Sequence, residues 1–295
     1  MITFRPIELS DSAWMRACVR ADGRINCEYS FGNIFTYAAR FPLTAANCCG
    51  CLVTKCELPE EDFYCFPVGN DARAAALQAL IETALAEDRP AVLYGMNADD
   101  SAMLHEQFHG RFLAEKDRGS FDYVYNTADL TTLSGKKYQA KRNHISFFLR
   151  NTRWTYEKIT AQNAPECLAM SEQWLLQNES DYRDDLEGEL KIIRRALENF
   201  DALGYVGGLL RADGRVIAYT MGEALNDEVF CVHFEKAFPD IRGAYPAINQ
   251  MFVQQELQTF RFINREDDVD IENLRRAKES YHPAFLIEKY EARLK

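Results

Sequence analysis

Two short segments of the sequence hold the polar side chains whose types could carry chemistry. The first, LSGKKYQAKRNHISFF at 133–148, contains Lys137, Lys141, Arg142, Asn143 and His144. The second, INREDDVDIENLRRAKESYHPAF at 263–285, contains Asn264, Arg265, Glu266, Arg275, Lys278, Tyr281 and His282. Cations, carboxylates, a hydroxyl and imidazoles in one set can bind and deprotonate an amine or hydroxyl, or hold a carboxylate or phosphate.

The first segment lies in an island of positive charge. The chain of 295 residues has a formal net charge of −11, yet residues 134–158 include seven lysines or arginines and one acid. If 135–150 is helical, Lys137, Lys141 and His144 share one face, at spacings of four and three. An apolar face that can dock between two domains is then formed by Tyr138, Ile145, Phe148 and Leu149. The alternative is a solvated linking helix whose basic face pairs with acidic domain surfaces.

The second segment begins where a short predicted strand gives way to a helix. In open α/β sheets ligands bind at the carboxyl ends of strands, which is the expected position of Asn264 and Arg265. We expect both residues to bind substrate. Arg275 and Lys278 are three residues apart on the predicted helix, so they share a face and are expected to bind an anionic group.

The catalytic residues expected from the same segment are Glu266, Tyr281 and His282. Glu266 or His282 is the predicted base, since a carboxylate or an imidazole can accept a proton from an amine or hydroxyl. The alternative for His282 is a structural hydrogen bond, because imidazole is a common buried polar linker. Acids at the start of the helix and bases near its end would also stabilise the helix dipole without any catalytic role.

Composition excludes several classes of function. A net charge of −11 argues against a general DNA-binding protein, because phosphate binding needs clustered positive charge. Neither a signal peptide nor a run of about 20 apolar residues is apparent, so we expect a cytoplasmic protein without an integral membrane segment. Of nine cysteines, several cluster in NCCGCLVTKC at 47–56 without two separated CxxC pairs. Buried reduced thiols are therefore expected rather than a metal site.

The order of elements in the second half is clear. A strand at 154–160 precedes helices at 163–178 and 184–202. Three strands at 204–211, 215–225 and 228–236 are separated by Asp213-Gly214 and Asn226-Asp227, which are hairpin signals. A helix at 244–259, a strand at 260–264, a helix at 270–280 and a closing strand AFLIEKY complete the order β-α-α-β-β-β-α-β-α-β. This order is the one used by GNAT-type (N-acetyltransferase-like) domains.

The first half is a looser copy of the same succession. It contains a strand at ITF, helices from Asp11 and at 30–40, strands near 45–55 and 62–66, and a long alanine-rich helix. The strand AVLYG, a helix at 99–108 and the strand SFDYVYN follow. We therefore predict an α/β (α+β) fold of two tandem GNAT-like domains, each a mixed central sheet flanked by helices. The expected divisions are a degenerate N-terminal domain at 1–130, a basic linker helix at 131–153 and a C-terminal domain at 154–295.

At LSGKKYQAKRNHISFF, IRGAYPAINQMF (241–252) and the segment 263–285, the sequence resembles a bacterial family sharing the C-terminal domain of phosphatidylglycerol lysyltransferases. The resemblance covers most of the chain and implies tandem GNAT-like domains with a cleft between them. It also implies a relationship to Fem-type enzymes, which transfer aminoacyl groups from aminoacyl-tRNA. The lysyltransferases that act on lipid carry a multi-span membrane domain, and its absence from this sequence argues against a lipid substrate.

GNAT enzymes that use acetyl-CoA have a loop Q/R-x-x-G-x-G/A before the central helix, whose backbone N–H groups hold the pyrophosphate. Here the loop reads DIRGAY, with Asp240 at the first position and Tyr245 at the last small position. An acidic residue and a bulky residue both oppose diphosphate binding, so aminoacyl-tRNA is the preferred expected donor. Acetyl-CoA is the runner-up, and no cofactor is certain.

The leading hypothesis is an acyl- or aminoacyl-transferase acting on an amine or hydroxyl acceptor, with its site in a cleft between the two domains. The substrate-binding residues expected from the basic segment are Lys137, Lys141, Arg142, Asn143 and His144. The expected partners are a small anionic or amino-acid-like substrate and aminoacyl-tRNA. The alternatives are a non-catalytic module that binds a carboxylate- or phosphate-bearing metabolite, an acetyl-CoA-dependent N-acetyltransferase, and a scaffold without a small-molecule site. Proximity of Lys141, Arg142 or His144 to residues 265–281 would favour the transferase over the solvated linker.

Overall fold

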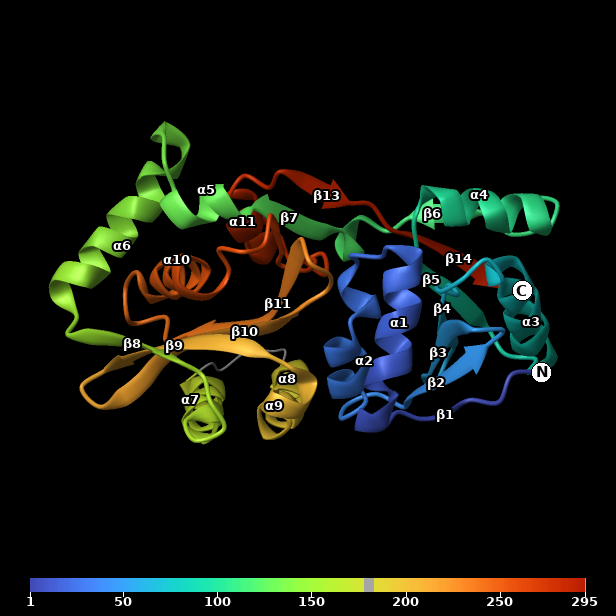
Figure 1. Ribbon diagram of the computed structural model, residues 1–295, viewed down its shortest axis with the longest axis horizontal. Helices are drawn as coiled ribbons and strands as arrows, with labels where there is room; N and C mark the ends of the chain where they lie inside the picture. The colour runs from blue at the N-terminus through green and yellow to red at the C-terminus, as the bar shows by residue number, and fades with distance from the viewer. Residues whose placement is uncertain (178–182, 295) are drawn as a thin grey trace. The chain divides into compact units, whose positions relative to one another are not determined.

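The chain forms two compact units (Figure 1), and the computed structural model describes residues 1–177 and 183–294. Unit 1 consists of Met1–Asp122, Asp267–Arg275 and Leu286–Lys295, and unit 2 consists of Tyr123–Glu266 and Arg276–Phe285. The final residue of the helix expected at 163–178 lies outside the described residues.

Unit 1 is built on a seven-stranded sheet of order β1-β2-β3-β4-β5-β14-β6. Its strands are β1 (Arg5–Pro6), β2 (Leu43–Cys48), β3 (Cys51–Glu57), β4 (Asp62–Cys65), β5 (Ala91–Met96), β6 (Ala114–Lys116) and β14 (Tyr290–Leu294). Neighbouring strands are antiparallel except β4 and β5, which are parallel. The sheet is therefore mixed, as predicted.

The helices of unit 1 are α1 (Ser12–Asp22), α2 (Phe31–Tyr37), α3 (Arg73–Ala86) and α4 (Ala98–Gln107). In α3, strong helix formers repeat at spacings of three and four, so Leu77, Leu80 and Ala84 face the core. They pack with sheet residues such as Val53 and Leu93, which are fully buried. Each buried leucine or valine contributes about 1.5–3 kcal/mol relative to an exposed one.

Unit 2 is built on a second seven-stranded sheet, of order β13-β7-β12-β11-β10-β9-β8. Its strands are β7 (Asp122–Asn126), β8 (Trp154–Lys158), β9 (Val206–Ala212), β10 (Arg215–Ala224), β11 (Val229–Ala237), β12 (Phe262–Asn264) and β13 (Phe285–Ile287). Asp213 and Gly214 form the predicted two-residue turn between β9 and β10, with φ of 48° and 80°. Strands β8 to β11 form an antiparallel meander, and β11 pairs with β12 in parallel.

Helices cover both faces of the unit 2 sheet (Figure 1). One face carries α7 (Ala164–Gln177), α8 (Arg183–Glu198) and α9 (Phe200–Leu203). The other carries α10 (Ala244–Glu256), which packs against α5 (Thr127–Thr132) and α6 (Gln139–Asn151). The short α11 (Glu272–Glu279) follows β12. Ile217, Phe230 and Phe252 are buried between the layers.

The two sheets share one arrangement: an antiparallel meander of four strands, β1 to β4 or β8 to β11, followed by a parallel pair, β4–β5 or β11–β12. The predicted succession of elements is therefore repeated. The divisions expected at 1–130, 131–153 and 154–295 differ from the two units, because β7 joins the second sheet whereas β14 inserts into the first. The basic segment 131–153 lies within unit 2.

One predicted strand is wrong. Residues 45–55 were expected to form a single strand, but Cys48 ends β2 and Cys51 begins β3. Between them, Cys49 and Gly50 take left-handed φ values of 56° and 81°, which make a two-residue hairpin turn. A run of apolar cysteines conceals this turn in the sequence. In the part of the chain that is described, no helix is long and apolar enough to cross a membrane.

Candidate active site in unit 2

The functional side chains of unit 2 gather where two parallel strands stop pairing. The β11–β12 ladder runs from Val229–Phe262 to Cys231–Asn264 and ends there. Beyond it, Arg265 and Glu266 stay bonded to Tyr123 on the β7 side, through Arg265 N–H to the Tyr123 carbonyl and Tyr123 N–H to the Glu266 carbonyl. Beyond Asn264 the backbones of β11 and of residues 265–266 no longer pair. Their side chains therefore contact one another where the two strands separate.

A β-bulge at His233 sets which side chains face which layer. Phe234 pairs with Met221 and Val232 pairs with Gly222, so His233 is the extra residue on β11. Simple alternation would put Cys231 and Glu235 on the same face of the sheet. Because Cys231 pairs with Glu223 and Glu235 pairs with Thr220, the bulge instead puts them on opposite faces. Two polar clusters result, one on each face.

The cation cluster lies on the face covered by α10 and α6. Lys141 Nζ is 3.8 Å from the centre of the Tyr281 ring, and the Arg265 guanidinium carbon is 4.8 Å from the same centre. Arg265 Nη2 donates to Glu235 Oε1 at 2.9 Å, and Asn249 Nδ2 of α10 donates to Glu235 Oε2 at 2.9 Å. Two cations thus adjoin one carboxylate and one aromatic ring.

The cation cluster has more positive than negative charge, and some of its buried polar atoms lack hydrogen-bond partners among the described residues. Burial and repulsion by Arg265, opposed by Glu235, lower the pKa of Lys141 to about 8. The Nη1 atom of Arg265 and the Oδ1 atom of Asn249 are buried and have no hydrogen-bond partner among the described residues. Buried polar atoms are nearly always paired, so such orphans indicate where an anionic or polar ligand can bind.

The imidazole cluster lies on the opposite face. His233 Nδ1 is 2.7 Å from Glu266 Oε1, and His233 Nε2 is 3.2 Å from Glu223 Oε1. The side chains of His233 and Glu223 are 0% and 1% exposed, and that of Glu266 is 16% exposed. Cys231 Sγ is 3.9 Å from Glu266 Oε1, and the Tyr205 and His233 rings are 5.5 Å apart between centres.

Charge in the imidazole cluster favours a protonated His233. Burial of the ring opposes its positive charge, but the electrostatic influence of Tyr205 and Cys231, with the hydrogen bonds to Cys231 and Glu223, outweighs burial, so the pKa of His233 lies well above its usual range. Both ring nitrogens then donate to carboxylates. The chain Glu223–His233–Glu266 fixes the orientation of a carboxylate that is partly open to solvent.

Three predicted residues are brought together in the cation cluster, namely Lys141, Arg265 and Tyr281. Glu266 belongs to the imidazole cluster on the opposite face of the sheet, and it has an unusual left-handed φ of 57°. The buried Asn264 is a support, because its Oδ1 accepts the Glu266 N–H at 2.7 Å. Lys278 is a second support, since its Nζ donates to the Arg265 carbonyl at 2.6 Å.

The other predicted residues of the basic segment lie outside the cation cluster. Lys137 is exposed in a short 3-10 turn before α6, so the helical spacing that would align it with Lys141 does not apply. Arg142 Nη1 donates to the carbonyls of Leu133 and Gly135, which stabilises the preceding turn. Asn143 and His144 are exposed on α6.

Two predicted residues of the second segment have local structural partners. Arg275 belongs to unit 1, where it forms ion pairs with Asp268 and Asp270 at 2.8 and 2.6 Å. His282 is exposed, with its ring edge-on to Tyr138 and Nε2 3.4 Å from the Lys137 carbonyl. The prediction that the site lies between two domains stays a prediction.

Four residues that sequence reasoning missed are His233 and Glu235 of β11, Glu223 of β10 and Asn249 of α10. A signal was present in EVFCVHFEK, where histidine and two acids interrupt an apolar strand. The bulge that separates His233 from Glu235 is not encoded in any local pattern of residue types.

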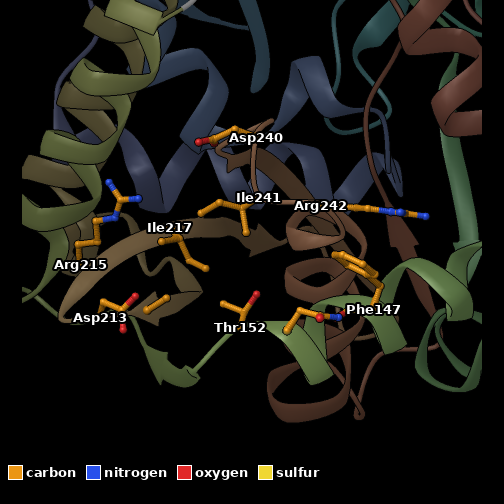
Figure 2. Close-up of a pocket in the computed structure, with 10 residues that line it drawn as sticks. Phe147, Thr152, Asp213, Arg215, Ile217, Asp240, Ile241 and Arg242 are labelled. Atoms are coloured by element: carbon orange, nitrogen blue, oxygen red, sulfur yellow. The ribbon is translucent and has the colours of Figure 1, made fainter.

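A cavity of about 370 Å³ lies beside the β9–β10 hairpin of unit 2 (Figure 2). It is lined by the end of α6, the β9–β10 hairpin and the loop before α10, including Asp213, Arg215, Asp240 and Arg242. The Arg215 and Arg242 side chains lie on opposite sides of it (Figure 2). No residue of the cation or imidazole cluster lines this cavity.

The start of α10, next to this cavity, is covered by α6. Gly243 caps α10 with φ of 89°, and a Cβ there would be 2.3 Å from the His144 carbonyl oxygen and 3.0 Å from Phe148 Cβ. A phosphate binding at a helix start needs open backbone N–H groups. Here backbone of α6 occupies the space beside Gly243. This packing opposes diphosphate binding, in addition to the charge of Asp240 and the bulk of Tyr245.

Comparison with known proteins gives a consistent result. A family profile described as "Phosphatidylglycerol lysyltransferase, C-terminal" matches residues 23–293. An uncharacterized protein of Mycoplasmoides gallisepticum is 28% identical over 178 residues, which are 58% of this chain and 55% of that protein. The alignment thus spans little more than half the length of that relative.

Solved structures resemble the whole chain. A conserved protein of unknown function from Bacteroides thetaiotaomicron has a TM-score of 0.93 and 38% identity, with 100% of both chains covered. The C-terminal domain of a protein assigned as a lysylphosphatidylglycerol synthetase from Agrobacterium fabrum gives 0.69 and 14%, covering 98% of this chain and 93% of that one.

Two further solved structures bear on the fold alone. FemX has a TM-score of 0.59 at 10% identity, covering 98% of this chain and 97% of its own. A tandem GNAT protein of clavulanic acid biosynthesis has 0.52 at 9%, covering 100% and 99%. The predicted tandem GNAT-like fold, shared with Fem-type proteins, is confirmed.

Proposed function

From the premise that the chain belongs to the family of the phosphatidylglycerol lysyltransferase C-terminal domain, we propose that unit 2 transfers an acyl or aminoacyl group to an amine or hydroxyl. The family and fold support a transferase-like role. The finer assignment concerns which residues act, and it rests on the two clusters at the end of the β11–β12 ladder.

The observation that carries this proposal is the hydrogen-bonded chain from Glu223 through His233 to Glu266. It holds a partly exposed carboxylate, and Arg265 of the cation cluster is the preceding residue in the chain. A general base must lie within hydrogen-bond reach of the proton it removes, and the supporting residues must fix its position. Glu266 meets both needs, because His233 and Asn264 bond to its carboxylate and its backbone N–H.

In the proposed reaction the Glu266 carboxylate accepts the proton of the acceptor N–H or O–H. The freed electron pair attacks the ester carbonyl of the donor, and a new N–C or O–C bond forms. Lys141 and Arg265, on the other face of the sheet, bind the negative charge carried by a more distant part of the donor. The ester C–O bond then breaks, and the leaving hydroxyl recovers the proton from Glu266.

Aminoacyl-tRNA is the donor class that fits best. Its reactive part is an ester on a ribose hydroxyl, which needs no diphosphate site at the start of α10. Acetyl-CoA does need such a site, and α6 packs against Gly243 at that position. The experiment below compares aminoacyl-tRNA with acetyl-CoA as the donor.

The experiment is a transfer assay with the purified chain. Donors are bulk tRNA charged with radiolabelled amino acids, and labelled acetyl-CoA. Acceptors are a set of primary amines, amino alcohols and phosphatidylglycerol vesicles. Time-dependent movement of label from tRNA to one acceptor class supports the proposal. Transfer from acetyl-CoA alone would contradict the donor assignment.

A non-catalytic binding module is the second candidate, and the orphan donor of Arg265 favours it equally. A module of that kind would bind a carboxylate or phosphate ligand at the cation cluster and never consume it. Ligand-induced thermal stabilisation without transfer in the full set of donors and acceptors would favour this candidate over the transferase.

A further inference from the structure

The imidazole cluster has the composition of a metal site as well as that of a base. The atoms Cys231 Sγ, His233 Nδ1 and Glu266 Oε1 all lie within 4.8 Å of one another. A thiolate, an imidazole and a carboxylate are the ligand types that zinc prefers, and tetrahedral bonds of about 2.0–2.3 Å put ligand atoms about 3.3–3.8 Å apart. The pair His233 Nδ1–Glu266 Oε1 at 2.7 Å would need to open by less than about 1 Å to reach this geometry.

The surroundings of His233 match those of a metal-bound imidazole. A ligating histidine almost always donates its other N–H to a carboxylate or carbonyl, which fixes the tautomer. Here Nε2 faces Glu223 Oε1 at 3.2 Å, and Glu223 is 1% exposed. The ring would keep its Nε2–H bond to Glu223 while Nδ1 turned to a metal ion.

Three independent features single out this position. The bulge at His233 re-aims that side chain away from regular alternation, as bulges near active sites do. Glu266 holds a left-handed φ of 57°, a strained conformation for a residue other than glycine. Tyr205, 5% exposed, has a buried hydroxyl without a hydrogen-bond partner among the described residues. A water on a metal ion would supply one.

We propose that Cys231, His233 and Glu266 bind one zinc ion, with a fourth position left for water. Binding releases the thiol proton of Cys231 and the Nδ1 proton of His233, so the two ligands become a thiolate and a neutral imidazole. Because the ion takes the Glu266 carboxylate, its binding also stops transfer. This second consequence rests on the proposed function, whereas zinc binding itself does not.

The test is a titration of the purified, chelator-treated chain with Zn²⁺ by isothermal calorimetry, and with Co²⁺ by absorbance. We expect one ion per chain and a thiolate-to-cobalt charge-transfer band. Cys231→Ser should abolish the band and weaken zinc binding at least about 100-fold, and Glu223→Gln should weaken it about 10- to 100-fold. Cys49→Ser and Cys167→Ser are matched controls for an exposed and a buried thiol elsewhere, and they should bind like the wild type.

Unchanged binding in Cys231→Ser, or loss of binding in Cys49→Ser instead, overturns the site. If circular dichroism shows that Cys231→Ser does not fold, the site is tested by zinc binding of Glu223→Gln and by the cobalt spectrum of the wild type. Wild-type zinc affinity in Glu223→Gln and no thiolate-to-cobalt band would then overturn it. Absence of any 1:1 binding by the folded wild type also overturns it. If the chain binds zinc but shows no transfer activity, only the proposed function is contradicted. If the chain transfers and zinc does not inhibit the transfer, only the proposed inhibition is contradicted.

Discussion

Lys141 Nζ lies 3.8 Å from the centre of the Tyr281 ring, although the two residues come from segments at opposite ends of unit 2 in the sequence. The contact brings the basic segment 133–148 against the segment 263–285, next to Arg265 and Glu235. A linking helix that merely exposes its basic face to solvent would not half-bury a lysine against a tyrosine and an arginine. Lys141 therefore differs in kind from the exposed lysines of the same segment.

Removal of the Lys141 charge should weaken ligand binding. Charge-assisted hydrogen bonds contribute about 1.5–3 kcal/mol, so Lys141→Ala should raise Kd about 10- to 150-fold. The measurement is calorimetry with puromycin 5′-phosphate, a stable analogue of the aminoacyl end of a tRNA. Lys137→Ala removes an exposed cation four residues away and should leave Kd within about twofold. Equal losses in both variants would mean that general charge, not the cluster, attracts the ligand.

Ligand binding should also fall as the pH rises above about 8. The pKa of Lys141 is lowered to about 8 by burial and by Arg265, so the ammonium is charged below that pH and neutral above it. Affinity for puromycin 5′-phosphate should therefore be constant between pH 6.5 and about 7.5 and decline beyond it. Lys141→Arg should remove the decline, because guanidinium stays protonated throughout. A wild-type affinity that does not change with pH would show that the charge of Lys141 does not contribute to ligand binding.

Glu223 should act as a positioning residue rather than a catalytic one. Glu223→Gln keeps the shape of the side chain but loses the carboxylate that orients His233. We expect kcat of transfer to fall about 10- to 100-fold with KM within about twofold, since the ligand does not touch Glu223. A rise in KM with unchanged kcat would instead place Glu223 in contact with substrate.

The start of α10 offers a test of how α6 is held. Gly243→Ala puts a Cβ 2.3 Å from the His144 carbonyl oxygen, whereas Gly214→Ala meets no atom within 4 Å. Both glycines have left-handed φ, so both substitutions should cost about 1–2 kcal/mol of conformational strain. Gly243→Ala should cost at least about 1 kcal/mol more, measured as the free energy of unfolding in urea. Equal costs would show that α6 moves aside freely.

Unit 1 contains a buried ion pair whose disruption should be costly. Lys289 Nζ lies 2.7 Å from Asp122 Oδ1 and 2.6 Å from Glu28 Oε2, and Lys289 is 3% exposed. Lys289→Ala leaves the buried carboxylate of Asp122 uncompensated, so the free energy of unfolding should fall by about 3–5 kcal/mol. Lys116→Ala, which breaks an exposed pair with Glu288, should cost less than about 1 kcal/mol. Urea denaturation of both variants makes the comparison.

Most of the element order was predictable because periodicity and turn signals are local. The Asp213-Gly214 hairpin and the alanine-rich α3 are examples. The insertion of β14 beside β5, the bulge at His233 and the turn at Cys49-Gly50 were not predictable in the same way. Each depends on how strands pair in the folded protein, because the sequence pattern of an apolar strand does not indicate which sheet it joins.

The sequence predicted several residues of the candidate site but not how they are arranged in space. Residue types identified Lys141, Arg265 and Glu266, because cations and a carboxylate beside a strand end are informative in themselves. The same reasoning also selected Arg275, whose partners Asp268 and Asp270 lie in the loop just before its own helix. Composition does not distinguish a residue that binds substrate from one that closes a local ion pair.

The most direct test of the central claim is the rate of aminoacyl transfer by Glu266→Gln, measured beside its Kd for puromycin 5′-phosphate. Loss of a general base should lower kcat about 10²- to 10⁴-fold, while Kd stays within about threefold because the cation cluster is intact. If Glu266→Gln transfers the aminoacyl group at the wild-type rate, Glu266 is not the general base and the proposed mechanism is contradicted.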